Sequence, residues 1–270
     1  AGGISTLLII NKKSAIFAQV KRYLLLSIFG LMFSTGLFFA LRVGAFAEDG
    51  WAGMFDPLMN SIVYSSGLGS ALNFRIVAVL FAALFYWLCL LDCAVNKPLN
   101  IVKWGLMIST FICIGLSFAY TGHVSTQGVI EKIILLTHIL LAFVWLGALY
   151  PLWLATKSLA RSTAHQILHR FGTYASMGVA TLIVAGTGLA YIISQFKWQT
   201  FTTFWGNWLM VKLAFVGIIL LIAAWHKWHL VPKFQLHPIQ NKMQRSITFE
   251  ILIGMAVLSS TSVLSTLVSP

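Results

Sequence analysis

The sequence has little charge and very few acidic residues. Of its 270 residues only 9% are charged, six are Asp or Glu, and 59% are hydrophobic. Soluble domains are roughly 25% charged and 45–50% apolar. So few polar residues exclude a water-soluble fold, because they cannot cover a core of this size. Intrinsic disorder is excluded by the same figures, since it requires low hydrophobicity. The mean hydropathy of +0.89 instead indicates a polytopic membrane protein.

Cysteine and the common catalytic motifs are also scarce or missing. The three cysteines, Cys89, Cys93 and Cys113, make no disulfide framework. The sequence has no Gly-rich phosphate loop, no G-x-S-x-G elbow and no acidic residues paired within a predicted span. We therefore expect neither ATP-driven pumping nor enzymatic catalysis.

Hydrophobic runs predict the fold class. A membrane-spanning helix needs about 20 apolar residues, and seven runs meet that length. Residues 1–10 resemble the end of a leading helix. Because the chain opens in mid-run without Met, we expect its true N-terminus to lie upstream. The sequence predicts an all-α polytopic transmembrane helix bundle, a single domain over residues 1–270, with eight spans of which the first is only partly present. The predicted full spans are 23–47, 70–93, 101–121, 132–155, 171–194, 206–226 and 247–267.

Lys and Arg predict the orientation in the membrane. Most of the 18 basic residues fall in alternate loops, and loops rich in Lys and Arg stay in the cytoplasm. This orientation places the C-terminus and the loop around Gly122 and His123 on the outer side. The net charge of +12 follows this topology. No basic stripe with interleaved aromatics occurs, so we expect no nucleic-acid partner.

Two histidines are the candidate metal ligands. His138 is predicted to lie about two helical turns inside the outer end of its span, where a polar side chain is a functional candidate by default. His123 ends the preceding span, and the short connection makes the two helices antiparallel neighbours. Two neutral imidazoles facing an outer cavity suit copper or zinc. The residues alone leave open that His138 only forms a hydrogen bond between helices.

Several residues are supporting candidates for this site. Glu131 and Trp145 lie seven residues on either side of His138, so the three share one helix face. Lys212 lies near an outer helix end, where it either snorkels outward or holds a carboxylate. Copper(I) also accepts thioether ligands, and three methionines are predicted on the outer side: Met54, Met59 and Met210.

Polar residues also occur near the cytoplasmic ends of the predicted spans. Glu250 is expected either to form an ion pair with Arg245 or Lys242, or to act as a proton or cation relay. His165 and His169 have the spacing of one helix face, and we interpret them as polar residues at the level of the lipid headgroups.

A series of short motifs resembles a known family. In chain order they are Gly122-His123, His138 with Trp145-Leu146-Gly147-Ala148-Leu149, Arg170-Phe171, Thr202-Thr203-Phe204-Trp205-Gly206 with Lys212, Leu230-Val231-Pro232, and Glu250. In this order and spacing they resemble the CopD family (copper resistance protein D) of bacterial inner-membrane proteins. The resemblance runs from about residue 70 to the end. The family usually has Asn-Arg where this chain has His226-Lys227.

The resemblance implies a copper-handling protein of the inner membrane, with a copper ion as ligand. Its implied surroundings are the lipid bilayer and a periplasmic copper-binding protein of the CopC type. The leading hypothesis is a copper importer that captures copper at His123 and His138. Two alternatives remain open: the same histidines ligate haem in a membrane redox protein, or the chain is a non-transporting docking platform for a periplasmic copper chaperone.

Overall fold

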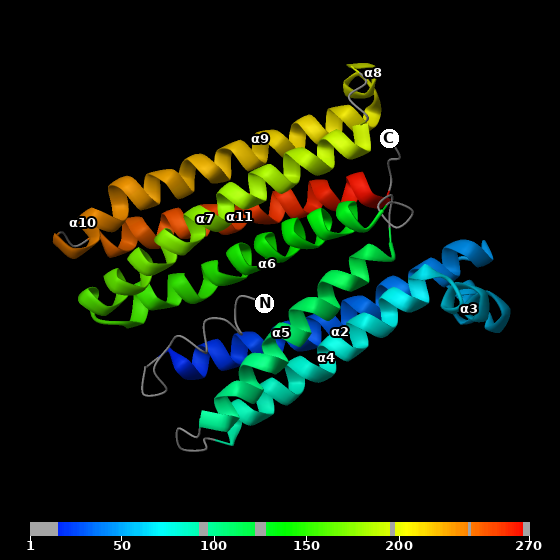
Figure 1. Ribbon diagram of the computed structural model, residues 1–270, viewed down its shortest axis with the longest axis horizontal. Coiled ribbons are helices and arrows are strands. Elements are labelled where there is room, and N and C mark those ends of the chain that lie inside the picture. Colours follow the sequence, from blue (N-terminus) through cyan, green and yellow to red (C-terminus); the bar gives the residue numbers. More distant parts are fainter. Residues whose placement is uncertain (1–15, 92–96, 122–127, 195–197, 237–238, 267–270) are drawn as a thin grey trace. The chain divides into compact units, whose positions relative to one another are not determined.

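The computed structural model describes residues 16–91, 97–121, 128–194, 198–236 and 239–266, and every regular element in these ranges is helical (Figure 1). Seven of the helices are long and apolar enough to cross a membrane. This confirms the predicted all-α polytopic fold class. The predicted partial span at residues 1–10 lies outside the described residues. The long helices are α2 (Phe17–Ala47), α4 (Gly67–Leu90), α5 (Lys97–Ala119), α6 (Val129–Ser158), α7 (Arg161–Ser194), α9 (Phe204–Trp225) and α11 (Gln240–Thr266).

Polar residues at the predicted loop positions fix several helix starts. The Ser66 hydroxyl accepts a hydrogen bond from the Leu68 amide at the start of α4. The Thr203 hydroxyl likewise accepts a hydrogen bond from the Gly206 amide at the start of α9, over 3.1 Å. Such caps satisfy amides that have no partner inside the helix. These hydroxyl caps set where the apolar spans begin.

The chain divides into two compact units. Unit 2 comprises Lys21–Leu140, and its principal feature is the α4–α5 hairpin. The Arg75 guanidinium of α4 donates to the Ser117 hydroxyl of α5 over 3.3 Å. It also lies 5.3 Å from the ring centroids of Phe38 in α2 and Phe118 in α5. One cation thereby ties three helices of unit 2 together.

The connection between α2 and α4 carries two short helices, η1 (Ala52–Phe55) and α3 (Pro57–Tyr64). Asp56 caps α3 by accepting from the Met59 amide over 2.7 Å. Trp51 and Phe55 are among the most exposed large side chains of the protein. Aromatic rings in such positions favour the membrane–water interface.

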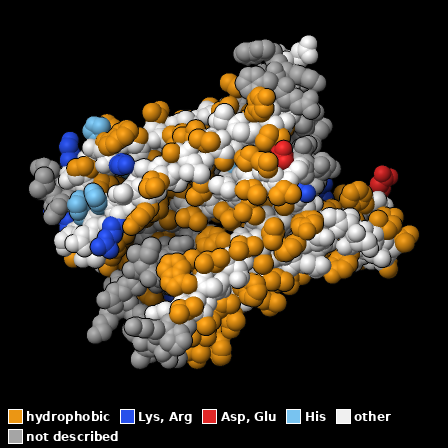
Figure 2. Space-filling view, viewed as in Figure 1, with side chains coloured by type: hydrophobic (Ala, Val, Ile, Leu, Met, Phe, Trp, Pro, Cys, Tyr) orange, Lys and Arg blue, Asp and Glu red, His pale blue; other side chains and the backbone are white. Residues whose placement is uncertain are grey.

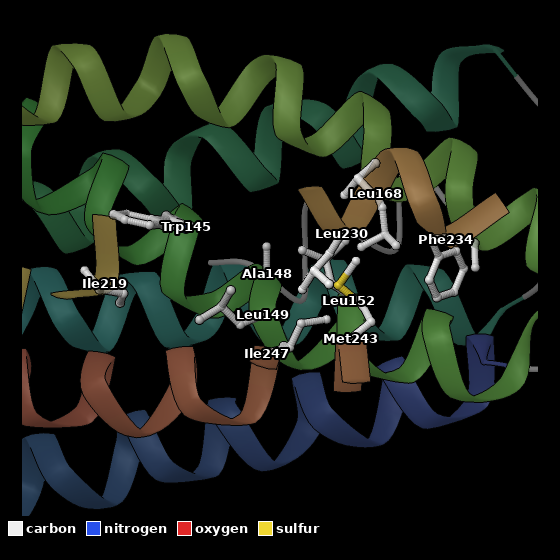
Figure 3. Packing of buried hydrophobic residues seen from close by; sticks show 12 residues of the cluster. Trp145, Ala148, Leu149, Leu152, Leu168, Ile219, Leu230, Phe234, Met243 and Ile247 are labelled. Carbon is white, nitrogen blue, oxygen red and sulfur yellow. The ribbon is translucent and has the colours of Figure 1, made fainter. Parts of the chain in front are cut away.

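Unit 1 comprises Ala1–Val20 and Leu141–Pro270 and holds the larger buried core. Side chains of α6, α7, α9, α11, η3 (His226–Leu230) and α10 (Val231–Leu236) build this core. Figure 3 shows Trp145 and Ile219 near one end of the cluster and Phe234 at the other. The core therefore runs along the length of the helices.

The exposed surface matches a membrane environment. Large hydrophobic side chains remain exposed on most of the spanning helices, and Figure 2 shows them over the sides of the molecule. Helices that are apolar all round need lipid or protein on every side. In the same view, Lys, Arg and His side chains gather at the end of unit 1 that carries α10.

Candidate functional site

His138 lies inside a spanning helix. It follows the start of α6 by nine residues, which is about 13 Å along the axis, and its side chain is partly buried. Because α6 is one continuous helix from Val129 to Ser158, Glu131, His138 and Trp145 occupy one face, as their spacing predicts. His123, the other predicted ligand, lies outside the described residues, so the pairing of the two imidazoles stays a prediction.

The helix before α6 approaches it close to His138. A Cβ atom added to Gly115 of α5 would lie 2.7 Å from Leu136 Cδ1 of α6. A side chain at position 115 would require Leu136 to shift. The α5 and α6 helices are therefore in contact two residues before His138, as expected for successive helices joined by a short connection.

Glu131 has a local structural role. It is the acidic residue in the first turn of α6, and its Oε2 atom would lie 2.7 Å from a Cβ atom added to Gly128. Its carboxylate thus folds back over the helix start, where the unpaired amides carry partial positive charge. This position stabilises α6 whether or not Glu131 supports a metal site.

The other supporting candidates lie in separate surroundings. Met54 packs at the end of α2, with its Cγ atom 2.9 Å from a Cβ atom added to Gly44. Met59 and Lys212 are partly buried, and Met210 is 54% exposed. Within the described residues, no group of three or more His, Cys, Asp or Glu lies close enough to hold a metal ion.

Four hydrogen-bonded side chains form a polar cluster in unit 1, which we call the Glu250 cluster: Trp145, His226, Ser246 and Glu250. The Trp145 indole donates from Nε1 to Glu250 Oε1 over 3.2 Å. Glu250 Oε2 lies 2.9 Å from His226 Nδ1, and His226 Nε2 lies 2.6 Å from the Ser246 hydroxyl. The Glu250 residue is 2% exposed. This is a buried carboxylate with two hydrogen-bonding partners.

A break in helix regularity carries His226. Pro232 has no amide hydrogen and cannot make the bond that an α-helix requires of it. Just before it the chain forms a π-helical turn, η3, in which the Val231 amide donates to the His226 carbonyl. Such wide turns often occur at functional positions. The helix continues as α10, so the apolar stretch extends to Phe234 and does not end at 226 as predicted.

The surroundings of Glu250 differ from those expected from the sequence. The expected ion pair with Arg245 or Lys242 does not form, because both cations are exposed while Glu250 faces His226. The sequence contains a signal for this inward position. Met243, Ile247, Glu250 and Gly254 are spaced as one helix face, and all four are buried.

His165 and His169 share a face of α7, as their spacing predicts, with ring centroids 6.1 Å apart. Lys227 lies near the same end of unit 1, where its Nζ atom donates to the Ser176 hydroxyl over 2.6 Å. These side chains belong to the polar end of unit 1 and stand apart from the Glu250 cluster.

The spanning helices define a multi-pass, all-helical membrane protein with buried polar side chains. The family model described as "Copper resistance protein D" (CopD) matches residues 165–264, which include His226, Ser246 and Glu250. This match confirms the resemblance to the CopD family over those residues. The family description implies copper resistance or transport rather than catalysis.

Two curated relatives are consistent with this resemblance. The chain is 29% identical over 237 residues to "Inner membrane protein YebZ" of Escherichia coli (strain K12), covering 83% of this chain and 77% of that protein. It is 25% identical over 275 residues to "Copper transport protein CutJ" of Bacillus subtilis (strain 168), covering 96% of this chain. The chain spans about half of CutJ, 48% of its length. No solved structure matches.

Proposed function

We propose that this protein moves copper across the inner membrane, inward, from a capture site on the outer side. The observation that carries the proposal is His138, a partly buried imidazole about 13 Å inside a spanning helix of a chain that resembles the CopD family. A polar side chain at that depth is costly to bury and is a functional-site candidate by default. Imidazole is also a good copper ligand. The name of the relative CutJ supports transport.

His123 and His138 form the capture site in this proposal, with copper as cargo. Glu131, Trp145 and Lys212 are supporting residues, and the thioethers of Met54, Met59 and Met210 are candidate additional ligands for copper(I). A periplasmic CopC-type protein is the proposed donor of copper. The protein performs no catalysis of its own.

The polar groups within unit 1 support a route inward. Trp145 lies on the same face of α6 as His138, about 10 Å further along the axis. It donates to Glu250, which in turn contacts His226. The basic side chains at the α10 end (Figure 2) support the orientation with that end in the cytoplasm and the C-terminus in the periplasm.

Copper uptake by the purified protein in liposomes tests the proposal. We expect His138→Ala and His123→Ala to bind less copper and to lower uptake by about tenfold or more, because loss even of groups that orient a metal ligand costs 10–100-fold. His169→Ala is the matched control, since His169 is exposed on α7. Unchanged copper stoichiometry and uptake in the folded His138 and His123 variants would refute the capture site.

The same preparation separates the alternatives. A Soret absorption band corresponding to one haem per chain would identify a redox protein. Copper binding without uptake would identify a docking platform. If the protein is the proposed transporter, we expect no Soret band, together with copper binding and copper uptake.

A further inference from the structure

The Glu250 cluster connects three elements through one chain of hydrogen bonds. Trp145 comes from α6, His226 from the junction of α9 and η3, and Ser246 and Glu250 from α11. The contacts run from Trp145 Nε1 through the two oxygens of Glu250 and the two ring nitrogens of His226 to the Ser246 hydroxyl. Ser246 is one helical turn nearer the start of α11 than Glu250 is. The chain of contacts therefore points toward the basic end of unit 1.

The charge balance of this cluster depends on a proton. A carboxylate that is 2% exposed inside a span needs a positive partner nearby. Among the residues that the structure describes, His226 is the one group that forms an ion pair with Glu250. An imidazole carries positive charge only when it holds a second proton. The pair is neutral with one proton on His226 or on Glu250, and has a net charge of −1 without it.

The other charged groups near the cluster are directed elsewhere. From η3, Lys227 donates to Ser176 of α7, and His229 stacks on Trp225 with ring centroids 4.2 Å apart. On α10, Lys233 is exposed, and on α11, Lys242 and Arg245 are exposed. From α6 the residue that meets the carboxylate is Trp145, whose indole is a donor that does not ionise.

We propose that Glu250 and His226 together form a proton-binding site whose single proton exchanges with a copper(I) ion during transport. This inference rests on the proposed function and adds the ion to which copper movement is coupled. With the proton bound, the doubly protonated ring donates from Nδ1 to Glu250 and from Nε2 to Ser246.

The exchange balances in charge and atoms. One proton leaves from His226 Nε2 to water by way of the Ser246 hydroxyl, and the pair then carries a net charge of −1. One copper(I) ion in the inner half of the helix bundle neutralises that charge. When the ion departs, one proton from water returns to the pair, and copper stays in the same oxidation state throughout.

Proton release on copper binding tests the proposal. Copper(I) is added anaerobically to the purified full chain in weakly buffered detergent solution, and an indicator dye reports the protons released per copper bound. We expect about one proton per copper from this pair in the wild type, and its loss in Glu250→Gln and His226→Gln. The Glu250→Gln variant keeps an oxygen that accepts from Trp145, and its side chain has nearly the same shape as that of Glu. His169→Gln and Asp49→Asn, at exposed positions, are the matched controls and should retain the full release.

The outcomes distinguish this proposal from the one on which it rests. If wild-type protein takes up copper but Glu250→Gln and His226→Gln release as many protons as wild type, the proton site is refuted and the transport function stands. If the wild type neither binds nor takes up copper, the proposed function itself fails. Should both variants be unfolded, infrared difference spectra of the wild type decide. A change in carboxyl and imidazole protonation on copper addition supports the site, and its absence refutes it.

Discussion

At the scale of single residues, Trp145 and Arg75 each donate a hydrogen bond to a neighbouring helix. Trp145 is 8% exposed and belongs to the main core, yet its indole also donates to Glu250. A buried donor and acceptor are strongly interdependent, because removing one leaves the other without a partner.

We therefore expect Trp145→Phe to destabilise the protein by about 1–3 kcal/mol, since the ring remains but the bond to a buried carboxylate is lost. Denaturant titration in detergent measures this loss. Trp225→Phe is the control, because Trp225 is 48% exposed and a Phe ring still stacks on His229. Equal stabilities of the two variants would show that the indole bond contributes nothing.

Arg75 holds unit 2 together through its charge. It contacts the Phe38 and Phe118 rings and the Ser117 hydroxyl. We expect Arg75→Gln to cost about 1–3 kcal/mol, because each cation–π contact contributes roughly 0.5–2 kcal/mol. Arg42→Gln should cost less, since within the described residues the contact of Arg42 is with the Phe38 ring. Thermal unfolding of both variants in one detergent compares them, and a larger loss for Arg42→Gln would contradict this ranking.

At the scale of elements, the spanning helices could be predicted well and the contacts between them only in part. Runs of apolar residues fix the existence of a span, because length against bilayer thickness is a local property. The buried face of α11 could also be predicted, since Met243, Ile247 and Glu250 share one helix face. The partner of Glu250 could not, because it depends on a π-helical turn ahead of Pro232 that brings His226 toward α11.

Gly254 of α11 lies against the Leu146 side chain of α6. An added Cβ atom there would lie 2.6 Å from Leu146 Cδ2, while at Gly217 of α9 it would meet nothing within 4 Å. We expect Gly254→Leu to destabilise the protein by about 1–3 kcal/mol through overpacking and to weaken the Trp145–Glu250 contact one turn away. Gly217→Ala should be neutral or stabilise by up to about 1 kcal/mol, because Ala is the better helix former.

Unfolding measurements on the two glycine variants give the comparison, and the proton-release assay reports on the cluster. A Gly254→Leu protein as stable as wild type would show that Leu146 moves aside without cost. In that case α6 and α11 do not depend on this close approach.

At the scale of the whole molecule, the function depends on which end faces outward. His138 is near the start of α6, and His226 of the Glu250 cluster opens η3, next to α10. The basic side chains of unit 1 gather at the end that carries α10 (Figures 1 and 2). Loops rich in Lys and Arg resist translocation. In the proposed transport, the predicted orientation gives His138 access to periplasmic copper and opens the proposed proton site toward the cytoplasm.

Cysteine labelling in intact cells tests this orientation. The native cysteines are first replaced by Ala, and one new cysteine is introduced at either of two exposed positions: Asp49, after α2, or Ser162, at the start of α7. A maleimide that cannot cross the inner membrane should label Asp49→Cys from outside and Ser162→Cys only after lysis. The reverse pattern would put His138 on the cytoplasmic side, and the protein would then have to collect copper inside the cell and release it outward. Because this result depends on neither copper nor protons, it fixes the side that His138 faces independently of the uptake and proton-release assays.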